Sequence, residues 1–213
     1  MNQGALPLQQ LCEVAIQAAR AAGEFIQGTD RSTLQRRFKD AGSSAASQVV
    51  TEVDVRSEAI IRECLQAATE QWDIAFVGEE SSANDTDVTP ERLLKPYHWC
   101  VDPLDGTLPF VQGSPGYAVS IALVEQSGAP LIGVVYDPME AALTYAIKGQ
   151  GACRDQVPIV SSASVSTSLM AFADASFRLH ENYAEVLEIL NSYAKLEGLD
   201  GVELVYGSGC LLY

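Results

Sequence analysis

The stretch HWCVDPLDGTLPF, residues 98–110, places two carboxylates, Asp102 and Asp105, directly after an apolar run. The apolar residues predict a short strand, and Pro103 and Gly106 predict a turn at its end. Taken alone, such a turn is explained by a proline-rigidified loop with an Asx hydrogen bond. Similar acidic clusters elsewhere in the chain favour a second interpretation, in which the turn binds something.

Two further acidic clusters lie at the ends of predicted elements. VTEVD precedes a predicted helix, where a helix cap is the default explanation. GEES follows a predicted short strand, where solvent-exposed glutamates are the default. The acidic residues at these ends are Glu52, Asp54, Glu79, Glu80, Asp102 and Asp105. Three such clusters in one chain are harder to explain as turns and caps than any one of them.

The residue types favour a hard divalent cation. Several carboxylates suit Mg²⁺, which takes oxygen ligands and keeps several waters. His98 is the only histidine near these clusters, and it is interpreted as a residue at the start of the strand. A zinc site is therefore disfavoured.

One alternative chemistry is excluded by residue type. Haloacid-dehalogenase-type phosphatases carry DxDGT, in which the first aspartate attacks phosphorus. Here the position two before Asp105 is Pro103, which has no nucleophilic group, and Asp102 lies three positions back. An aspartyl-phosphate mechanism is therefore not expected.

Together VTEVD, GEES and WCVDPLDGTLPF resemble the inositol monophosphatase family of magnesium-dependent phosphatases. Its signature reads like W-x-x-D-P-x-D-G-T-x-x-F, and the matching residues are Trp99, Asp102, Pro103, Asp105, Gly106, Thr107 and Phe110. The resemblance implies an α/β (α+β) fold, a layered αβαβα sandwich of the inositol monophosphatase/fructose-bisphosphatase type. It also implies a homodimer.

The resemblance further implies a role for each site residue. The Mg²⁺ ligands would be Glu79, Asp102, Asp105 and the backbone carbonyl of Leu104. Glu79 and Thr107 would orient and help deprotonate the attacking water, with Asp54 supporting Thr107 or a metal-bound water. The amides of Gly106 and Thr107 would hold the phosphate, which suits a turn that opens a helix.

The sequence departs from the family pattern near Tyr213. A further family motif of the W-D-x-A-A-G kind, which brings another aspartate to a second metal, is expected after a segment like GSGCLLY. The only Trp-Asp pair is Trp72-Asp73, far from that place. We therefore expect a C-terminally incomplete sandwich, with an N-terminal α+β domain over residues 1–155 and a partial C-terminal α/β domain over residues 156–213.

Hydrophobic periodicity predicts the other elements. Mixed α/β layers are favoured over an alternating parallel sheet, because strands follow one another without intervening helices. The predicted helices cover 6–28, 51–72 and 181–198, and the predicted strands 75–77, 117–125, 131–137, 142–152, 170–174 and 202–213. Residues 39–48 and 81–96 are predicted as loops.

Composition limits the partners. Thirteen basic and 28 acidic residues give a formal charge of −15, which disfavours nucleic acid and anionic membranes. Five scattered cysteines without a CxxC pair indicate reduced thiols and a cytoplasmic protein. No secretory signal or membrane-spanning segment is expected.

The leading hypothesis is a Mg²⁺-dependent phosphomonoesterase that acts on a small phosphorylated alcohol, similar to an inositol phosphate. A 3′(2′),5′-bisphosphate nucleotide and histidinol phosphate are alternative substrates, because Leu108-Pro109 after DGT matches no single substrate class. The alternative from another class is a non-catalytic or impaired family member that acts as a binding or regulatory protein.

Overall fold

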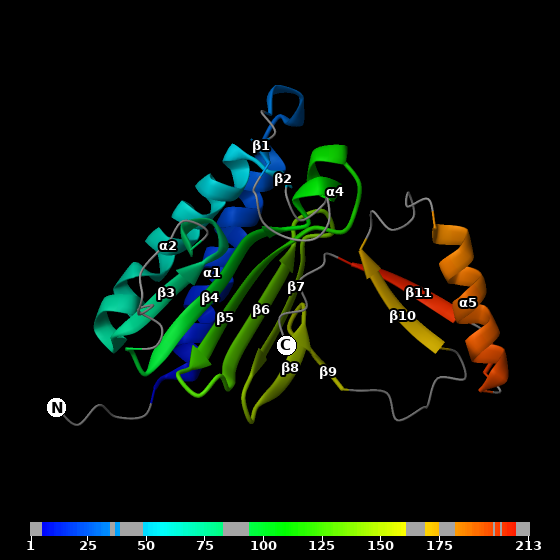
Figure 1. Cartoon of the computed structure of the whole chain (residues 1–213). Coiled ribbons are helices and arrows are strands. Elements are labelled where there is room, and N and C mark those ends of the chain that lie inside the picture. The colour runs from blue at the N-terminus through cyan, green and yellow to red at the C-terminus, as the bar shows by residue number, and fades with distance from the viewer. Residues whose placement is uncertain are drawn as a thin grey trace.

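The computed structural model describes residues 6–34, 37–38, 49–82, 94–160, 169–174, 182–197, 199–200 and 202–207. Figure 1 shows how its helices and strands follow one another along the chain. The helices are α1 Leu8–Gly28, the 3₁₀ helix η1 Arg31–Thr33, α2 Glu52–Trp72, α3 Glu79–Ser82, α4 Thr107–Gln112 and α5 Tyr183–Leu196. The strands are β1 Arg37–Phe38, β2 Val49–Val50, β3 Ile74–Gly78, β4 Tyr97–Asp105, β5 Ala118–Glu125, β6 Pro130–Asp137, β7 Ala142–Ile147, β8 Gly151–Arg154, β9 Val157–Ile159, β10 Leu169–Asp174 and β11 Val202–Gly207.

A seven-stranded sheet in the order β3-β4-β5-β6-β7-β8-β9 forms the centre of the molecule. Only β3 and β4 pair in parallel, and each later strand pairs antiparallel with the one before it. Tight turns join the later strands, and one of them, at 148–150, divides the run 142–152, predicted as one strand, into β7 and β8. The prediction of mixed layers over an alternating parallel sheet is confirmed.

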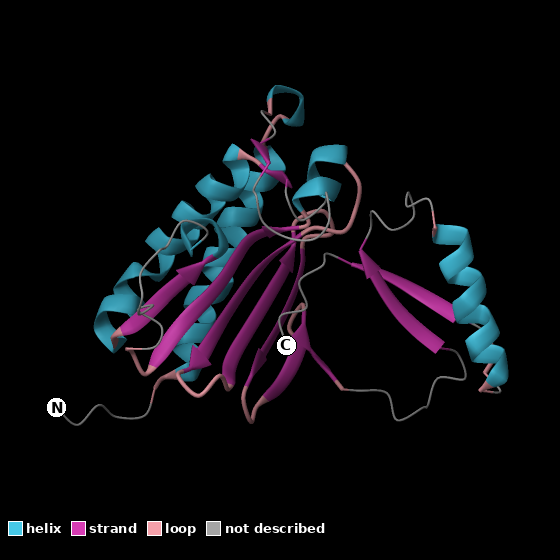
Figure 2. Ribbon diagram, viewed as in Figure 1, coloured by secondary structure: helices cyan, strands magenta, loops and turns pink. Residues whose placement is uncertain are grey.

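Helices α1 and α2 cover one face of this sheet, as Figures 1 and 2 show. The buried face of α1 is made largely of alanines, namely Ala15, Ala18, Ala19 and Ala22. Small side chains let the helix axis approach the sheet closely. At Gly23 a Cβ atom would lie 2.3 Å from the ring of Tyr136 on β6, so this position requires glycine.

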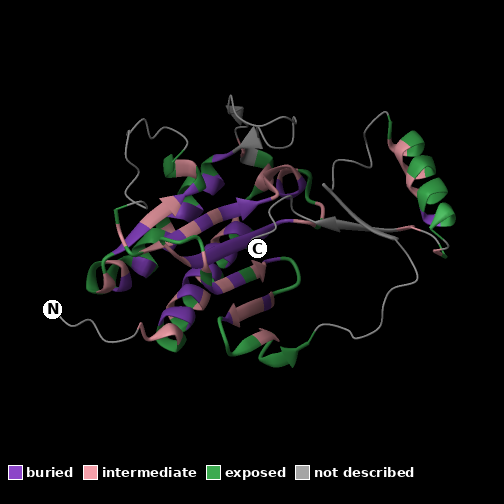
Figure 3. Cartoon of the chain, turned by 60° about the horizontal axis from the view of Figure 1, so that its bottom comes forward, coloured by how far each residue is buried: buried purple, intermediate pink, exposed green. Residues whose placement is uncertain are grey.

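The apolar core lies between these helices and the sheet, where Figure 3 shows the buried residues. Its fully buried large side chains include Trp99 on β4, Phe110 on α4 and Leu123 on β5. Each such side chain contributes about 1.5–3 kcal/mol by leaving water. Strand β4 and helix α4, which lie on either side of Gly106, are thus both anchored in the core.

One detail of the second helix differs from the prediction. In the sequence, the apolar residues Ile60, Ile61, Cys64 and Leu65 predict its buried side. Ile61 and Leu65 are fully buried, Ile60 is half-buried, and Cys64 is exposed. The buried face instead runs through Asp54, Glu58 and Ile61. Glu58 follows Asp54 by four residues, and Ile61 follows Glu58 by three, so all three lie on one side of the helix.

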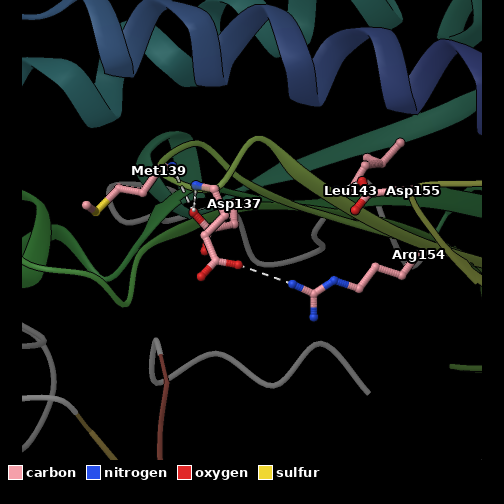
Figure 4. A network of polar contacts seen from close by, with 6 residues as sticks. Asp137, Met139, Leu143, Arg154 and Asp155 are labelled. Carbon is pink, nitrogen blue, oxygen red and sulfur yellow. Dashed lines mark hydrogen bonds and ion pairs between the residues drawn. The ribbon is translucent and has the colours of Figure 1, made fainter.

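A polar network closes the turns between β6, β7 and β8 (Figure 4). The carboxylate of Asp137 accepts a hydrogen bond from the backbone N–H of Glu140, and the Glu140 carboxylate pairs with Arg154 at 3.2 Å. Asp155 accepts a 2.8 Å hydrogen bond from the N–H of Leu143. By the strand register, these contacts lie at the same end of the sheet as Asp105, on strands further from β3.

The last elements form a smaller unit. β10 and β11 pair in parallel, and α5 packs beside β11. This agrees with the predicted strand, helix and strand of the C-terminal segment, while the division into domains 1–155 and 156–213 stays a prediction. Most of the two predicted loops, at 39–48 and 81–96, lies outside the described residues. Among the described residues, every helix is too short or too polar to span a bilayer.

Candidate functional site

The DPLD segment is strand and not turn, which corrects the prediction that β4 stops before it. In β4, Asp102 pairs with Ser120 and Asp105 pairs with Ala118 of β5, with a register shift between the two pairs. Three steps along one strand therefore match two steps along the other, which is a β-bulge. Residues three apart in a regular strand point to opposite faces. The bulge brings both carboxylates to one face of the sheet.

Glu79 joins them through the parallel pairing of β3 and β4. Gly78 at the end of β3 is the register partner of Val101 on β4. Glu79 directly follows Gly78, and Asp102 directly follows Val101. Both carboxylates therefore lie side by side at the same end of the sheet. This adjacency brings together two acidic clusters that are more than twenty residues apart in sequence.

The carboxyl group of Asp102 shows how crowded this edge is. Burial, followed by the negative charges of Glu79 and Asp105 and a hydrogen bond with Glu79, together raise its pKa to about 9. The N–H of Leu104 donates a 3.2 Å hydrogen bond to Asp102 Oδ1, which opposes the rise. Loss of solvation and two neighbouring acids both disfavour the charged form of the Asp102 carboxyl group, which is why its pKa is raised.

Gly106 makes the turn from β4 into α4. Its φ of +88° lies in the left-handed region, and a Cβ atom there would be 2.4 Å from the carbonyl oxygen of Gly116. Only glycine fits both conditions. α4 begins at Thr107, and the N–H groups of a helix's first turn have no acceptor within the helix.

Asp54 connects this turn to α2. The Thr107 hydroxyl donates a 2.7 Å hydrogen bond to Asp54 Oδ1 and lies 3.2 Å from the Leu104 carbonyl oxygen. The other oxygen of Asp54 accepts from the N–H and hydroxyl of Thr51, at 2.8 and 2.7 Å. Asp54 is 2% exposed, and burial raises its pKa despite these hydrogen bonds. It is thus a helix cap and the partner of Thr107 at once.

The donor set suits Mg²⁺ by its chemistry. Glu79, Asp102 and Asp105 supply only oxygen atoms, and a divalent cation would neutralise the repulsion that raises the pKa of Asp102. Across the described parts of the chain, no group of three or more His, Cys, Asp or Glu side chains is already arranged to hold a metal ion. The ligand assignment for Glu79, Asp102, Leu104 and Asp105 therefore stays a prediction.

Two residues beside the site were not found from the sequence. Arg31 of η1 donates a 2.9 Å hydrogen bond to the Tyr117 hydroxyl, and its guanidinium carbon lies 4.9 Å from the ring centroid of Phe110. No periodic pattern marks Arg31. Glu58 is a buried acid four residues after Asp54, and this spacing on the apolar face of a helix was the available signal.

Known proteins share both this sequence and this fold. The model of the Inositol monophosphatase family matches residues 7–213. Inositol monophosphatase 1 from Solanum lycopersicum is 38% identical over 160 residues, covering 74% of this chain and 54% of that protein. Nus factor SuhB from Pasteurella multocida is 36% identical over 150 residues, covering 68% of this chain and 50% of that protein.

A solved structure agrees. The extragenic suppressor protein suhB from Bartonella henselae superposes with a TM-score of 0.69 and 25% identity, covering 92% of this chain and 70% of that one. The fold is thus the layered α/β sandwich that the motifs implied. This chain belongs to the inositol monophosphatase family. It spans about half the length of the curated relatives it matches.

Proposed function

We propose that this chain is a Mg²⁺-dependent phosphomonoesterase that hydrolyses a small phosphorylated alcohol with an activated water. The observation that carries the proposal is the convergence of Glu79, Asp102 and Asp105 on one sheet edge, beside the Thr107–Asp54 hydrogen bond. Family membership supports a phosphatase. A carboxyl group with a strongly raised pKa, such as that of Asp102, is also typical of functional sites.

Mg²⁺ would be held by the carboxylates of Glu79, Asp102 and Asp105 and by the carbonyl of Leu104. When bound, it supplies positive charge that lowers the pKa of a water and screens the phosphate oxygens. This charge matters in a chain of formal charge −15, because the unneutralised carboxylates repel an anionic substrate.

Thr107 and Asp54 set the orientation of the attacking water. A hydroxyl group has one proton, and Thr107 commits it to Asp54 Oδ1 at 2.7 Å. The lone pairs of the Thr107 oxygen then remain as acceptors for a hydrogen of the water. Asp54 itself is held by both polar groups of Thr51, so the acceptor is fixed before substrate arrives.

The start of α4 would hold the phosphate. The N–H groups of Gly106 and Thr107 belong to the turn that the left-handed Gly106 creates. Unpaired N–H groups at such a turn are suited to phosphate oxygens. Glu79 completes the arrangement as the acceptor for the proton that the water loses.

Phosphate release tests the proposal. The substrates are inositol phosphate, a 3′(2′),5′-bisphosphate nucleotide, histidinol phosphate and fructose bisphosphate, each with and without Mg²⁺. We expect Mg²⁺-dependent turnover of at least one, and loss of it in Asp102→Asn. The matched control is Asp73→Asn, because Asp73 is exposed and its left-handed conformation suits asparagine. A folded wild-type chain without Mg²⁺-dependent turnover, or an Asp102→Asn variant with full activity, would refute the proposal.

A binding or regulatory role is the second candidate. Relatives named Nus factor SuhB, at 32–36% identity, favour it. Calorimetry separates the two roles, because a non-catalytic protein would bind a phosphorylated ligand or a protein partner without releasing phosphate.

We further propose a cytoplasmic homodimer that does not act on nucleic acid or membranes. The formal charge of −15 supports the exclusion of nucleic acid and anionic membranes, because both would be repelled. Light scattering tests the dimer, and retention of the chain by RNA or anionic vesicles at physiological salt would contradict the partner assignment.

A further inference from the structure

We propose that Glu58 is a positioning residue that fixes the β3–α3 turn so that Glu79 is held ready for Mg²⁺. Glu58 is 5% exposed, lies on α2 and has no place in the roles described above. The inference rests on the proposed function, because it concerns the same metal site. It adds a residue that the acidic motifs do not include.

The carboxylate of Glu58 binds the backbone directly after Glu79. Its Oε2 accepts hydrogen bonds from the N–H groups of Glu80 at 2.8 Å and Ser81 at 3.2 Å. These are first-turn amides of α3, a helix of one turn that is too short to be stable without such contacts. A charge-assisted bond to two adjacent amides fixes the orientation of the peptide groups on the C-terminal side of Glu79.

The same carboxylate also limits the backbone before Glu79. A Cβ atom at Gly78 would lie 2.2 Å from Glu58 Oε2 and 2.7 Å from Oε1. The chain at Gly78 therefore passes directly against the carboxylate, and only glycine permits this approach. Glu58 thus contacts the residues on both sides of Glu79, and the position of Glu79 follows from it.

Arg62 holds Glu58 in place. One of its guanidinium nitrogens lies 3.6 Å from Glu58 Oε1 and 3.0 Å from the Ser81 hydroxyl, to which it donates. The guanidinium carbon lies 3.9 Å from the ring centroid of Phe76 on β3. Glu58 is therefore paired with a residue of its own helix, and that partner, Arg62, packs against β3.

Asp54 and Glu58 lie one helical turn apart on the same face of α2. Asp54 holds the turn that carries Thr107, and Glu58 holds the turn that carries Glu79. Because both acids belong to one rigid helix, α2 sets the separation between the two turns. That separation decides whether Glu79 and the DPLD carboxylates can bind one cation.

The test compares Glu58→Ala, Glu58→Gln and Gly78→Ala with wild type. The control is Glu63→Ala, which removes an exposed acid lining the same surface hollow as Glu58. Mg²⁺ binding is measured by calorimetry on the substrate-free protein, and exchange of the β3–α3 amides by hydrogen–deuterium mass spectrometry. Circular dichroism checks that each variant is folded.

We expect Glu58→Ala to weaken Mg²⁺ binding by roughly 10- to 100-fold, the usual effect of losing a residue that orients a ligand, and to speed exchange at Glu80 and Ser81. Glu58→Gln should lose less, because its side-chain carbonyl still accepts from both amides. Gly78→Ala should resemble Glu58→Ala while keeping the acid, and it replaces that variant if the latter fails to fold.

The outcomes distinguish this inference from the proposed function. If wild type binds Mg²⁺ and the Glu58 and Gly78 variants bind it equally well, the positioning role is wrong and the proposed function stands. Faster exchange without weaker binding has the same meaning, since Glu58 would then be structural only. If wild type binds no Mg²⁺, the proposed metal site is wrong, and the role of Glu58 falls with it.

Discussion

Replacing Gly106 by alanine tests whether the turn before Thr107 has the conformation that the site requires. An alanine in the left-handed region costs about 1–2 kcal/mol. At Gly106 the added Cβ would also lie 2.4 Å from the carbonyl oxygen of Gly116 and 3.0 Å from Cα of Tyr117. These contacts are with backbone, so the turn must move, and such overpacking costs about 1–3 kcal/mol more.

Gly128 is the matched control. It has the same φ of +88°, but a Cβ atom there would meet nothing within 4 Å. Gly128→Ala therefore has only the conformational cost of about 1–2 kcal/mol, against roughly 2–5 kcal/mol for Gly106→Ala. The difference between the two variants isolates the crowding at the site from the cost of the left-handed conformation.

Urea unfolding measures this difference. With an m-value of about 2 kcal/mol per molar, an extra destabilisation of about 2 kcal/mol lowers the midpoint of Gly106→Ala by about 1 M relative to Gly128→Ala. Gly106→Ala should also lose phosphate release, because the amides of Gly106 and Thr107 move together. Equal midpoints for the two variants would show that Gly106 is not crowded in solution and would refute the turn geometry.

Three further predictions concern the residues around this turn and the thiols. Thr107→Val should lower phosphate release by about 10²–10⁴-fold while Thr107→Ser keeps it, which steady-state assays of both variants check. Asp54→Asn replaces one of two acceptor oxygens with an amide donor, so either Thr51 or Thr107 loses its acceptor, and the fold should be destabilised by about 1–3 kcal/mol in urea unfolding. Burial raises the pKa of Cys12 to about 11, so iodoacetamide at pH 8 should label exposed Cys64 first, and the contribution of Cys12 to stability should fall as the pH rises from about 9 to about 11.

The sequence was sufficient to predict the family, the three long helices and most of the longer strands, because these depend on local patterns. The pairing of Asp54 with Thr107 was expected from the resemblance, and the 2.7 Å hydrogen bond between them is observed. The strand through DPLD was not predicted, because proline and glycine normally indicate a turn. The bulge that keeps Asp102 and Asp105 on one face depends on the pairing with β5, so it cannot be predicted from the residues of β4 alone.

Glu58 was missed for a different reason. A glutamate in a helix is normally solvent-exposed, so its presence among Ile61 and Leu65 was not taken as a signal. Its partners are backbone amides of Glu80 and Ser81, and backbone groups are invisible to any comparison of residue types. The contact of Glu58 with these amides becomes visible only when α2 is packed against β3 in the fold.

The candidate site is stabilised by what surrounds it and not by its own interactions. Like charges at Glu79, Asp102 and Asp105 oppose one another, as the raised pKa of Asp102 shows. Their positions are imposed by the pairing of β3 with β4 and by the buried neighbours of the strand, such as Trp99. The rest of the fold holds these carboxylates together despite their mutual repulsion. Such repulsion is expected at a site whose function is to bind a cation. A cation bound there would remove the repulsion, so ligand binding and the stability of this edge of the sheet are linked.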